Sequence, residues 1–353
     1  LTISLEAKNR QEIEKQLKST FIDWDTVVKV STSHYVFPAI YCNFKRADFL
    51  KYLPVDMVEY MKHITNLNRD RNTHILQQAN KLNSLLLANN IRPIFLKGTG
   101  NLLAGIYDDI AERMVGDIDF IFSKEDYPKA IIILREFGYS EVHKYKYHFP
   151  YEKHYRRLLK ENNIAAIEIH KEFLDIKKYT NEFNYSFVEK DTQIVNGISV
   201  LSYANKLNLS IIANQINDHG FYYKTMALRN AYDVFLLSKK TNAIDAVKTL
   251  DKLTNPLNCF LAACYDVFNK ADSLTYNPTA KIESYLSGFN GQFTNRKTTK
   301  IRHKRIKAYL FLKSRVSIIY KSIIYKEYRI WLFNLLTDKN WYKEKLVQLG
   351  IKK

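Results

Sequence analysis

Residues 116–122 read GDIDFIF and place two carboxylates inside an otherwise apolar run. The run predicts a buried strand, in which successive side chains point to opposite faces, so Asp117 and Asp119 share a face with Cα atoms roughly 6.5–7 Å apart. Two carboxylates in this position repel each other unless a cation lies between them, and Mg²⁺ prefers such oxygen ligands. The pair therefore indicates a divalent cation site. In the alternative interpretation, one aspartate faces solvent at the end of the strand and the other caps the next turn.

The segments on either side of this strand carry further polar groups. Upstream, FLKGTG (95–100) predicts a strand and then a turn, where Gly98 and Gly100 let backbone N–H groups approach a phosphate. Downstream, IAAIEIHKEF (164–173) predicts an apolar strand with a third acid, Glu168. Two cations flank the same region of the sequence: Lys97 and Arg113. A glycine turn, an acid pair and a third acid are the groups of a phosphoryl- or nucleotidyl-transfer site.

The glycine segment also has a second interpretation. GTGNLLAG (98–105) resembles the fingerprint of a dinucleotide-binding domain, in which a strand, a glycine turn and a helix hold a pyrophosphate. Such a domain needs several strand–helix–strand units, whereas residues 1–90 and 191–353 read mainly as helix. It also leaves the pair Asp117 and Asp119 without a role, so we favour the transfer site.

This constellation resembles the nucleotidyltransferase superfold shared by DNA polymerase beta and the kanamycin nucleotidyltransferases. More closely, it is similar to a large bacterial family of uncharacterised nucleotidyltransferases with a KG…R…GDIDL core. The resemblance covers about residues 20–240, and its specific part lies in PIFLKGTGNLLAGIYDDIAERMVGDIDFIF (93–122). IEIHKEF (167–173) resembles the third-acid strand of the family. The helical lead-in and tail contribute three further polar residues: His34, His219 and Asp233. The glycine turn departs from the superfold, where Gly-Ser or Gly-Gly is commoner than Gly-Thr-Gly.

The resemblance implies a role for each polar residue of this core. Asp117 and Asp119 would hold one or two Mg²⁺ ions, with Mn²⁺ as a substitute, that bridge the triphosphate of a bound NTP. Glu168 would complete the catalytic and metal-binding set and accept the proton of an acceptor hydroxyl. Four residues would bind the nucleotide: Lys97, Gly98, Thr99 and Arg113. Two others would border the site: His170 and Asp233.

Several of these residues also have structural interpretations, which the sequence leaves open. Lys97 could end a strand in solvent. Arg113 could form a salt bridge to Glu112 or Asp109 instead of contacting a triphosphate. A structural role is also open for three other residues: His170, His219 and Asp233.

The spacing of apolar residues predicts an α+β protein. Residues 1–90 form a helical N-terminal region, residues 91–190 the nucleotidyltransferase-type core, a small mixed sheet with helices, and residues 191–353 a helical C-terminal region. Within the core, SKEDYPKAIIILREFG (123–138) predicts a helix that is capped by Ser123 and ends at Gly138.

The net charge of +18 is concentrated in one segment. Residues 294–330 contain twelve Lys or Arg and one acid, Glu327, and therefore carry +11 of the total of +18. This segment predicts an anionic partner, either RNA or an anionic membrane surface. In the structural alternative, it is a helix that packs on the body of the protein and exposes its lysines to water.

Other sequence features bear on the location of the protein. No run of about 18 apolar residues predicts a transmembrane helix, and the first residues lack an apolar signal core. Three cysteines form no metal-binding pattern: Cys42, Cys259 and Cys264. We therefore expect a cytoplasmic protein, with peripheral attachment to a membrane as an open alternative.

The sequence supports three functional hypotheses. The first is an Mg²⁺-dependent nucleotidyltransferase that moves a nucleoside monophosphate from an NTP to a hydroxyl group and releases pyrophosphate. Its acceptor would be a small molecule, a saccharide or peptide precursor, or a protein. The second is a toxin-like nucleotidyltransferase that acts on RNA ends such as those of tRNA. The third is a catalytically inactive nucleotide-binding or interaction module, against which the intact Asp117, Asp119 and Glu168 argue.

Overall fold

The computed structural model of the chain describes residues 1–19, 21–142, 147 and 149–338. The predicted α+β class is confirmed, because a mixed sheet has helical regions before and after it in the chain. The end of the predicted helical C-terminal region, residues 339–353, lies outside the described residues.

Contacts between residues divide the chain into two compact units. Unit 1 consists of Leu1–Val142 and Lys153–Gly291, and it contains the sheet and the polar residues of the predicted core. Unit 2 consists of His143–Glu152 and Gln292–Lys353. The three sequence regions with boundaries at residues 90 and 190 stay a prediction.

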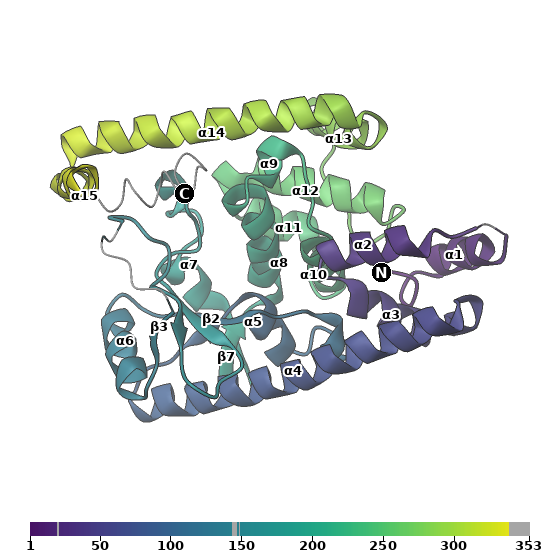
Figure 1. Cartoon of the computed structure of the whole chain (residues 1–353), viewed down its shortest axis with the longest axis horizontal. Coiled ribbons are helices and arrows are strands. Elements are labelled where there is room, and N and C mark those ends of the chain that lie inside the picture. Colours follow the sequence, from purple (N-terminus) through teal and green to yellow (C-terminus); the bar gives the residue numbers. More distant parts are fainter. Residues whose placement is uncertain (20, 143–146, 148, 339–353) are drawn as a thin grey trace. The chain divides into compact units, whose positions relative to one another are not determined.

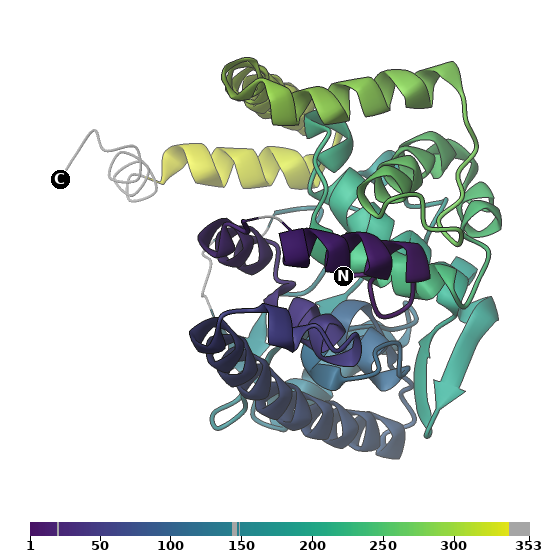
Figure 2. The same cartoon turned by 90° about the vertical axis from the view of Figure 1, so that its right-hand side faces the viewer.

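Four helices form the N-terminal part of unit 1, as the apolar spacing predicts: α1 (Ala7–Ser19), α2 (Trp24–Ser33), α3 (Phe37–Arg46) and α4 (Val55–Ala88). Helix α4 runs below the sheet and continues past it toward α1–α3 (Figures 1 and 2). Its second half buries Ile75, Leu82 and Leu86 in the main core with the sheet. Its first half buries Met57 and Met61 in a separate cluster with α3. One long helix therefore joins the N-terminal helices to the sheet.

The sheet has seven strands in the order β3-β4-β5-β2-β1-β7-β6. The strands are β1 (Ile94–Phe95), β2 (Asp117–Ile121), β3 (Ser140–Glu141), β4 (Leu158–Leu159), β5 (Ala166–His170), β6 (Thr192–Val195) and β7 (Ile198–Leu201). Strand β2 pairs with β5 in parallel and with β1 in the antiparallel direction. Its side chains Ile118, Phe120 and Ile121 are completely buried, which confirms the buried strand predicted from the apolar run.

Two strands of this sheet lie in the segment that the sequence analysis assigns to the helical C-terminal region. They are β6 and β7, which pair in the antiparallel direction around Asn196 and Gly197. Both turn residues have positive φ, 50° and 78°, as a two-residue hairpin turn of type I′ requires. Asn-Gly between two apolar runs is a signal for such a hairpin. The sheet therefore continues past residue 190, and β7 lies beside β1.

The remaining α-helices lie between the strands or after the last strand in the sequence. They are α5 (Lys97–Leu103), α6 (Asp126–Glu136), α7 (Tyr185–Val188), α8 (Tyr203–Ile212), α9 (Gly220–Tyr223), α10 (Leu228–Ser238), α11 (Ala243–Lys248), α12 (Thr254–Val267), α13 (Ala280–Thr294), α14 (Arg296–Ile324) and α15 (Lys326–Thr337). In α6, the Ser123 hydroxyl accepts a bond from the N–H of Asp126 at 3.0 Å, and Gly138 has φ 97° after the last turn. None of the described helices combines the length and the apolar character needed to cross a bilayer.

The turn predicted at residues 97–100 is wrong, because helix α5 already begins at Lys97. Lys97 adopts φ 49°, so the chain changes direction within one residue after β1. Gly100 then packs against the backbone of that strand, since a Cβ at this position would lie 2.5 Å from the carbonyl oxygen of Phe95. The glycines therefore serve close packing between a helix and a strand.

This close approach predicts a loss of stability for Gly100→Ala. The added methyl group has to displace strand backbone, so the free energy of unfolding should fall by about 1–3 kcal/mol, although alanine is the better helix former. Gly116→Ala is the matched control, because no atom lies within 4 Å of a Cβ there. Urea unfolding followed by circular dichroism measures both, and equal effects would contradict the packing argument.

Lys206 of α8 is a buried cation. Its side chain is 3% exposed, its ammonium donates to the carbonyl oxygen of Leu201, and no carboxylate among the described residues pairs with it. Burial lowers the pKa of Lys206 from 10.5 to about 7. The folded protein therefore binds this proton less tightly than the unfolded chain does.

The pKa of Lys206 predicts a pH-dependent gain in stability for Lys206→Met. Between pH 7 and 10.5 the unfolded lysine is protonated and the folded one is mostly neutral, so this lysine makes the wild-type protein more stable as the pH rises. Lys206→Met should raise the free energy of unfolding on the order of 2–4 kcal/mol at pH 7 and much less at pH 10. Urea unfolding at both pH values measures this difference. A constant difference would show that the ammonium is solvated in the folded state.

Candidate active site

The parallel pairing of β2 and β5 brings two acids together. The register places Asp119 opposite Glu168, so their side chains lie on the same face of neighbouring strands. His170 follows two residues later on β5 and shares that face. One ligand atom from each of these three residues lies within 4.8 Å of the other two. A parallel register thus converts two separate sequence motifs into one cluster.

The Lys97 side chain reaches the same cluster from the start of α5. Its Nζ lies 2.6 Å from Oδ1 of Asp119 and 3.7 Å from Oε2 of Glu168. The interpretation of Lys97 as a lysine that only ends a strand in solvent is therefore wrong. His170 contacts the same Asp119 oxygen through Nε2 at 2.9 Å, and its Nδ1 lies 3.3 Å from the carbonyl oxygen of Glu172.

The charges in this cluster shift the pKa values of its two carboxyl groups in opposite directions. Burial alone raises the pKa of Asp119, but Lys97 and His170 outweigh it and hold this pKa well below its usual range. Burial and the charge of Asp119 raise the pKa of Glu168. Burial and Lys97 lower the pKa of His170. Asp119 therefore stays ionised more readily than Glu168, and Glu168 is the carboxylate that takes up a proton more readily.

Asp117 lies on the same face of β2 but has a different partner. Its carboxylate forms an ion pair with Arg157, the residue that precedes β4. Each aspartate of the pair thus has a cation beside it, which offsets the repulsion between the two carboxylates. These cations are side chains of the protein, Arg157 beside Asp117 and Lys97 beside Asp119. The alternative of a solvent-facing aspartate and a turn cap does not fit, since the Asp119 carboxylate contacts Lys97 and His170 and the Asp117 carboxylate pairs with Arg157.

Arg113 and Asp233 form a buried ion pair next to this cluster. The Nε of Arg113 lies 3.1 Å from both carboxylate oxygens of Asp233, and the Tyr107 hydroxyl donates to Oδ1 at 2.6 Å. The predicted salt bridge from Arg113 to Glu112 or Asp109 is wrong. Those acids pair with other arginines instead: Glu112 with Arg46, and Asp109 with Arg69. Chain segments far apart in the sequence supply each pair.

Gly98 and Thr99 lie between these two groups. A Cβ on Gly98 would lie 3.5 Å from Cζ of Arg113, so the arginine borders the first turn of α5. The buried Thr99 hydroxyl donates to the carbonyl oxygen of Asp117 at 3.0 Å. Thr99 therefore fixes the start of β2 through its hydroxyl group, which positions the Asp117 backbone.

The two other histidines of the helical segments have structural surroundings. Nδ1 of His34 accepts the backbone N–H of Leu228 at 3.2 Å and so caps the start of α10. His219 adopts φ 57° at the start of α9. Neither histidine belongs to the three-residue cluster found among the described residues.

Sequence reasoning missed Arg157 and Tyr107. Arg157 meets Asp117 only because β4 pairs with β5, and β4 comprises two residues, too few for a recognisable pattern. Tyr107 belongs to the core segment that carries the resemblance, but nothing in its neighbours indicates that it donates to an acid 126 residues later.

A family comparison agrees with this arrangement. The model of a family described as uncharacterised nucleotidyltransferase matches residues 20–268, which is more than half of the chain. The chain belongs to this family of uncharacterised nucleotidyltransferases. The resemblance inferred from the GDID core is thereby confirmed.

Two solved structures from Helicobacter pylori are similar to this member of the nucleotidyltransferase family. JHP933 is 14% identical, and the match covers 69% of this chain and 97% of that chain with a TM-score of 0.30. A protein described as a candidate nucleotidyltransferase is 16% identical, with 69% and 96% covered and a TM-score of 0.31. No curated protein sequence matches the chain.

The donor atoms of this nucleotidyltransferase-family site fit a divalent cation. Asp119 and Glu168 offer carboxylate oxygens, and the Nδ1 of His170 faces the Glu172 carbonyl oxygen, which leaves Nε2 directed at the two acids. Ligating histidines commonly donate their other N–H to such a carbonyl group. Two carboxylates and an imidazole suit Mn²⁺ as well as Mg²⁺. Lys97 Nζ, a cation in contact with both acids, marks the place for a positive charge.

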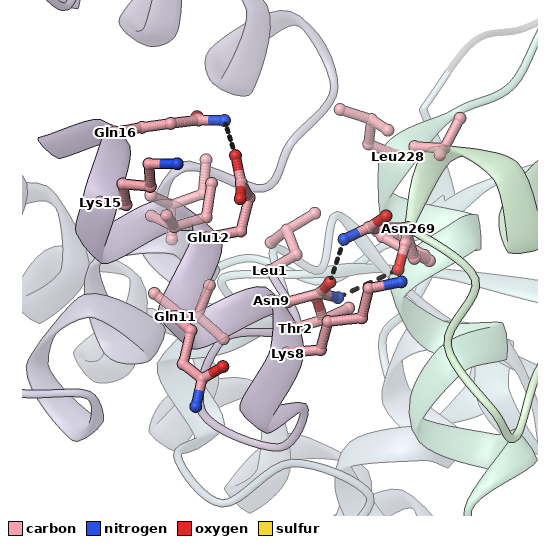
Figure 3. Close-up of a pocket in the computed structure, with 15 residues that line it drawn as sticks. Leu1, Thr2, Lys8, Asn9, Gln11, Glu12, Lys15, Gln16, Leu228 and Asn269 are labelled. Carbon is pink, nitrogen blue, oxygen red and sulfur yellow. Dashed lines mark hydrogen bonds between the residues drawn. The ribbon is translucent and has the colours of Figure 1, made fainter. Parts of the chain in front are cut away.

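A pocket elsewhere in unit 1 has no part in this site. It has an open volume of about 880 Å³ between α1 and the end of α12, and polar residues on its floor bond to one another (Figure 3). Asn9 donates to Thr2 at 2.7 Å and accepts from Asn269 at 3.0 Å. None of the polar residues expected at the nucleotidyltransferase site lines it.

Proposed function

We propose that the protein is a metal-dependent nucleotidyltransferase that moves a nucleoside monophosphate from an NTP to a hydroxyl group. The observation that carries this proposal is the buried cluster of Asp119, Glu168 and His170 with the ammonium of Lys97. Family membership supports a nucleotide as substrate. We also propose that the protein acts in the cytoplasm.

Asp119, Glu168 and His170 would hold a divalent cation, Mg²⁺ or Mn²⁺, with Asp117 as a further ligand. When bound, the metal neutralises charge on the triphosphate and on the attacking and leaving oxygens. The chain's own cations would then change partners. Lys97 and Arg157, released from Asp119 and Asp117, would bind phosphate oxygens of the NTP, because both side chains are partly exposed.

Glu168 is the residue with the properties of a general base. Its carboxylate is more exposed than that of Asp119, with side-chain exposures of 18% and 9%, so an acceptor hydroxyl would reach Glu168 first. In the transfer step, the acceptor oxygen forms a bond to the α-phosphorus and the bond from this phosphorus to the bridging oxygen breaks. Pyrophosphate leaves with that electron pair, and the hydroxyl proton passes to Glu168.

The residues next to the cluster would receive the triphosphate. Gly98 would bind phosphate oxygens through its backbone N–H. It also lets α5 pack closely, since a Cβ there would lie 2.9 Å from Cγ2 of Val115 and 3.5 Å from Cζ of Arg113. Asp233 would position Arg113 from its buried side through Nε. The Thr99 hydroxyl is engaged with Asp117, so we assign it to positioning the strand.

The decisive experiment tests whether a nucleoside monophosphate moves at all. The purified full chain is incubated with α-labelled and γ-labelled NTPs, Mg²⁺ or Mn²⁺, and fractions of small metabolites, protein or RNA. We expect label from the α-phosphate on a non-RNA acceptor and label from the γ-phosphate in pyrophosphate. Transfer to RNA alone would support the toxin-like alternative. Nucleotide binding without transfer to any fraction would support an inactive binding module.

A further inference from the structure

The long helix of unit 2 has an unusual charge. Helix α14 contains ten Lys or Arg in 29 residues and no Asp or Glu. The cations concentrate in its first half, where Lys297, Lys300, Lys304, Arg305 and Lys307 are exposed. Such a helix attracts an anionic partner.

The same helix exposes a continuous apolar face in its second half. Leu312, Val316, Ile319 and Ile323 follow one another at intervals of four, three and four residues, so they lie on one side of the helix. Their exposed fractions are 61%, 65%, 56% and 70%. Ala308, four residues before Leu312, and Ile301, seven residues before Ala308, lie on the same side, with Arg305 between them. We call Ile301, Ala308, Leu312, Val316, Ile319 and Ile323 the α14 stripe.

The α14 stripe differs from the side of the helix that is partly covered. The half-buried residues Ile306, Leu310 and Ser317 lie on the opposite side, because they are offset from the stripe by about half a helical turn. The α14 stripe is therefore not the half-buried side of the helix. Single exposed apolar residues are common on protein surfaces, but a row of them along one side of a helix is not.

Helix α15 adds further exposed apolar surface to unit 2. Ile330, Phe333 and Leu336 are 50%, 66% and 52% exposed. Arg329 donates to the carbonyl oxygen of Ile323 at 3.0 Å, which joins α15 to the end of α14 (Figure 1). Two helices thus present apolar side chains to solvent beside a strongly basic stretch.

Three kinds of partner could cover this surface, and the charge and the apolar area together select one. A second copy of α14 would bring ten cations against ten, which repel each other. RNA would neutralise the cations but would leave the aliphatic side chains of the α14 stripe in water. An anionic phospholipid bilayer satisfies both, because lysine and arginine side chains bind headgroups while aliphatic ones enter the acyl boundary.

We infer that α14 and α15 attach the protein to an anionic phospholipid surface. The α14 stripe lies at the boundary of the acyl chains, and the basic residues of α14 contact the lipid phosphates. This inference is independent of the proposed transfer reaction, since it rests on unit 2 alone. The attached protein would lie on the membrane surface, and neither helix would cross the bilayer.

Vesicle flotation with the full chain tests the attachment. The probes are vesicles of phosphatidylglycerol and phosphatidylcholine and vesicles of phosphatidylcholine alone. We expect binding only to the anionic vesicles. Lys304→Gln/Lys307→Gln/Arg315→Gln should weaken it about a hundredfold, since each cation near the surface contributes about a factor of five. Leu312→Ser/Ile319→Ser should weaken it at least about tenfold.

Matched controls change the same residue types on unit 1. Lys62→Gln/Lys81→Gln/Lys124→Gln removes three exposed cations, and Ile132→Ser/Ile194→Ser removes two exposed aliphatic side chains. Both should bind anionic vesicles like the wild type, and circular dichroism verifies that every variant is folded. The inference would be overturned if the wild type did not bind anionic vesicles. It would also be overturned if the cation variant lost binding while the α14 stripe variant bound like the wild type. RNA binding that depends only on the cations, or a dimer that the α14 stripe variant dissociates in sedimentation, would identify the rival partner.

Discussion

Asp119→Asn should lower nucleotidyl transfer roughly a thousandfold or more. Asp119 is the most connected acid of the cluster, because it contacts Lys97 and His170 and lies opposite Glu168 on the next strand. Asparagine keeps the shape of the side chain but removes the charge that would hold the metal, and electrostatic stabilisation of the reacting groups is usually the main source of catalysis. The measurement is transfer of α-labelled phosphate, with nucleotide binding measured separately.

Two further variants make this test specific. Asp117→Asn should also abolish most of the transfer, because Asp117 would become a metal ligand when Arg157 moves to the phosphates. Asp70→Asn is the control, since Asp70 is exposed on α4 and does not belong to the cluster. The fold of Asp119→Asn should persist, because Lys97 still lies 3.7 Å from Glu168. Wild-type transfer by both active-site variants would exclude a metal role for these acids.

Asp233→Ala should destabilise the protein by about 3–5 kcal/mol. The carboxylate of Asp233 and the guanidinium of Arg113 are both almost fully buried, with side-chain exposures of 2% and 8%. Removal of the acid leaves the Arg113 charge without its partner and the Tyr107 hydroxyl without its acceptor. A buried charge without its partner costs several kcal/mol, whereas replacement of both partners is often neutral. Urea unfolding measures the free energy.

The appropriate comparison uses a pair near the surface. The ion pair of Arg69 and Asp109 has side-chain exposures of 33% and 30%, so Asp109→Ala should cost about 1 kcal/mol. The double variant Asp233→Leu/Arg113→Met should be more stable than Asp233→Ala, because no uncompensated charge remains. If Asp233→Ala proved as mild as Asp109→Ala, the Arg113 guanidinium would have to be hydrated in the folded protein.

The sequence was sufficient where the signal is local. The apolar runs in residues 116–122 and 164–173 predict strands β2 and β5, and the shared face of Asp117 and Asp119 follows from the period of a strand. The long helix α4 follows from its apolar spacing in the same way. Each of these features depends only on residues that are neighbours in the chain.

The features that could not be predicted depend on distant partners. Nothing near Arg113 indicates that its partner is Asp233, which lies 120 residues later. The contact of Asp117 with Arg157 spans 40 residues and depends on the pairing of β4 with β5. The hairpin of β6 and β7 was predictable from Asn196-Gly197, and it was missed because its strands are short and a strong helical pattern follows them directly.

The pairing of Lys97 with Asp119 and of Arg157 with Asp117 has a consequence for the order in which ligands enter. Lys97 and Arg157 already neutralise the two acids and stay close to them because they belong to the same chain. A free metal ion would have to displace these side chains and would gain little binding free energy. A metal–NTP complex also carries negative phosphate oxygens. The two displaced side chains can bind these oxygens when the metal takes their place at the acids. In the proposed reaction, the metal and the nucleotide would therefore enter as one complex, and the protein alone would bind the metal only weakly.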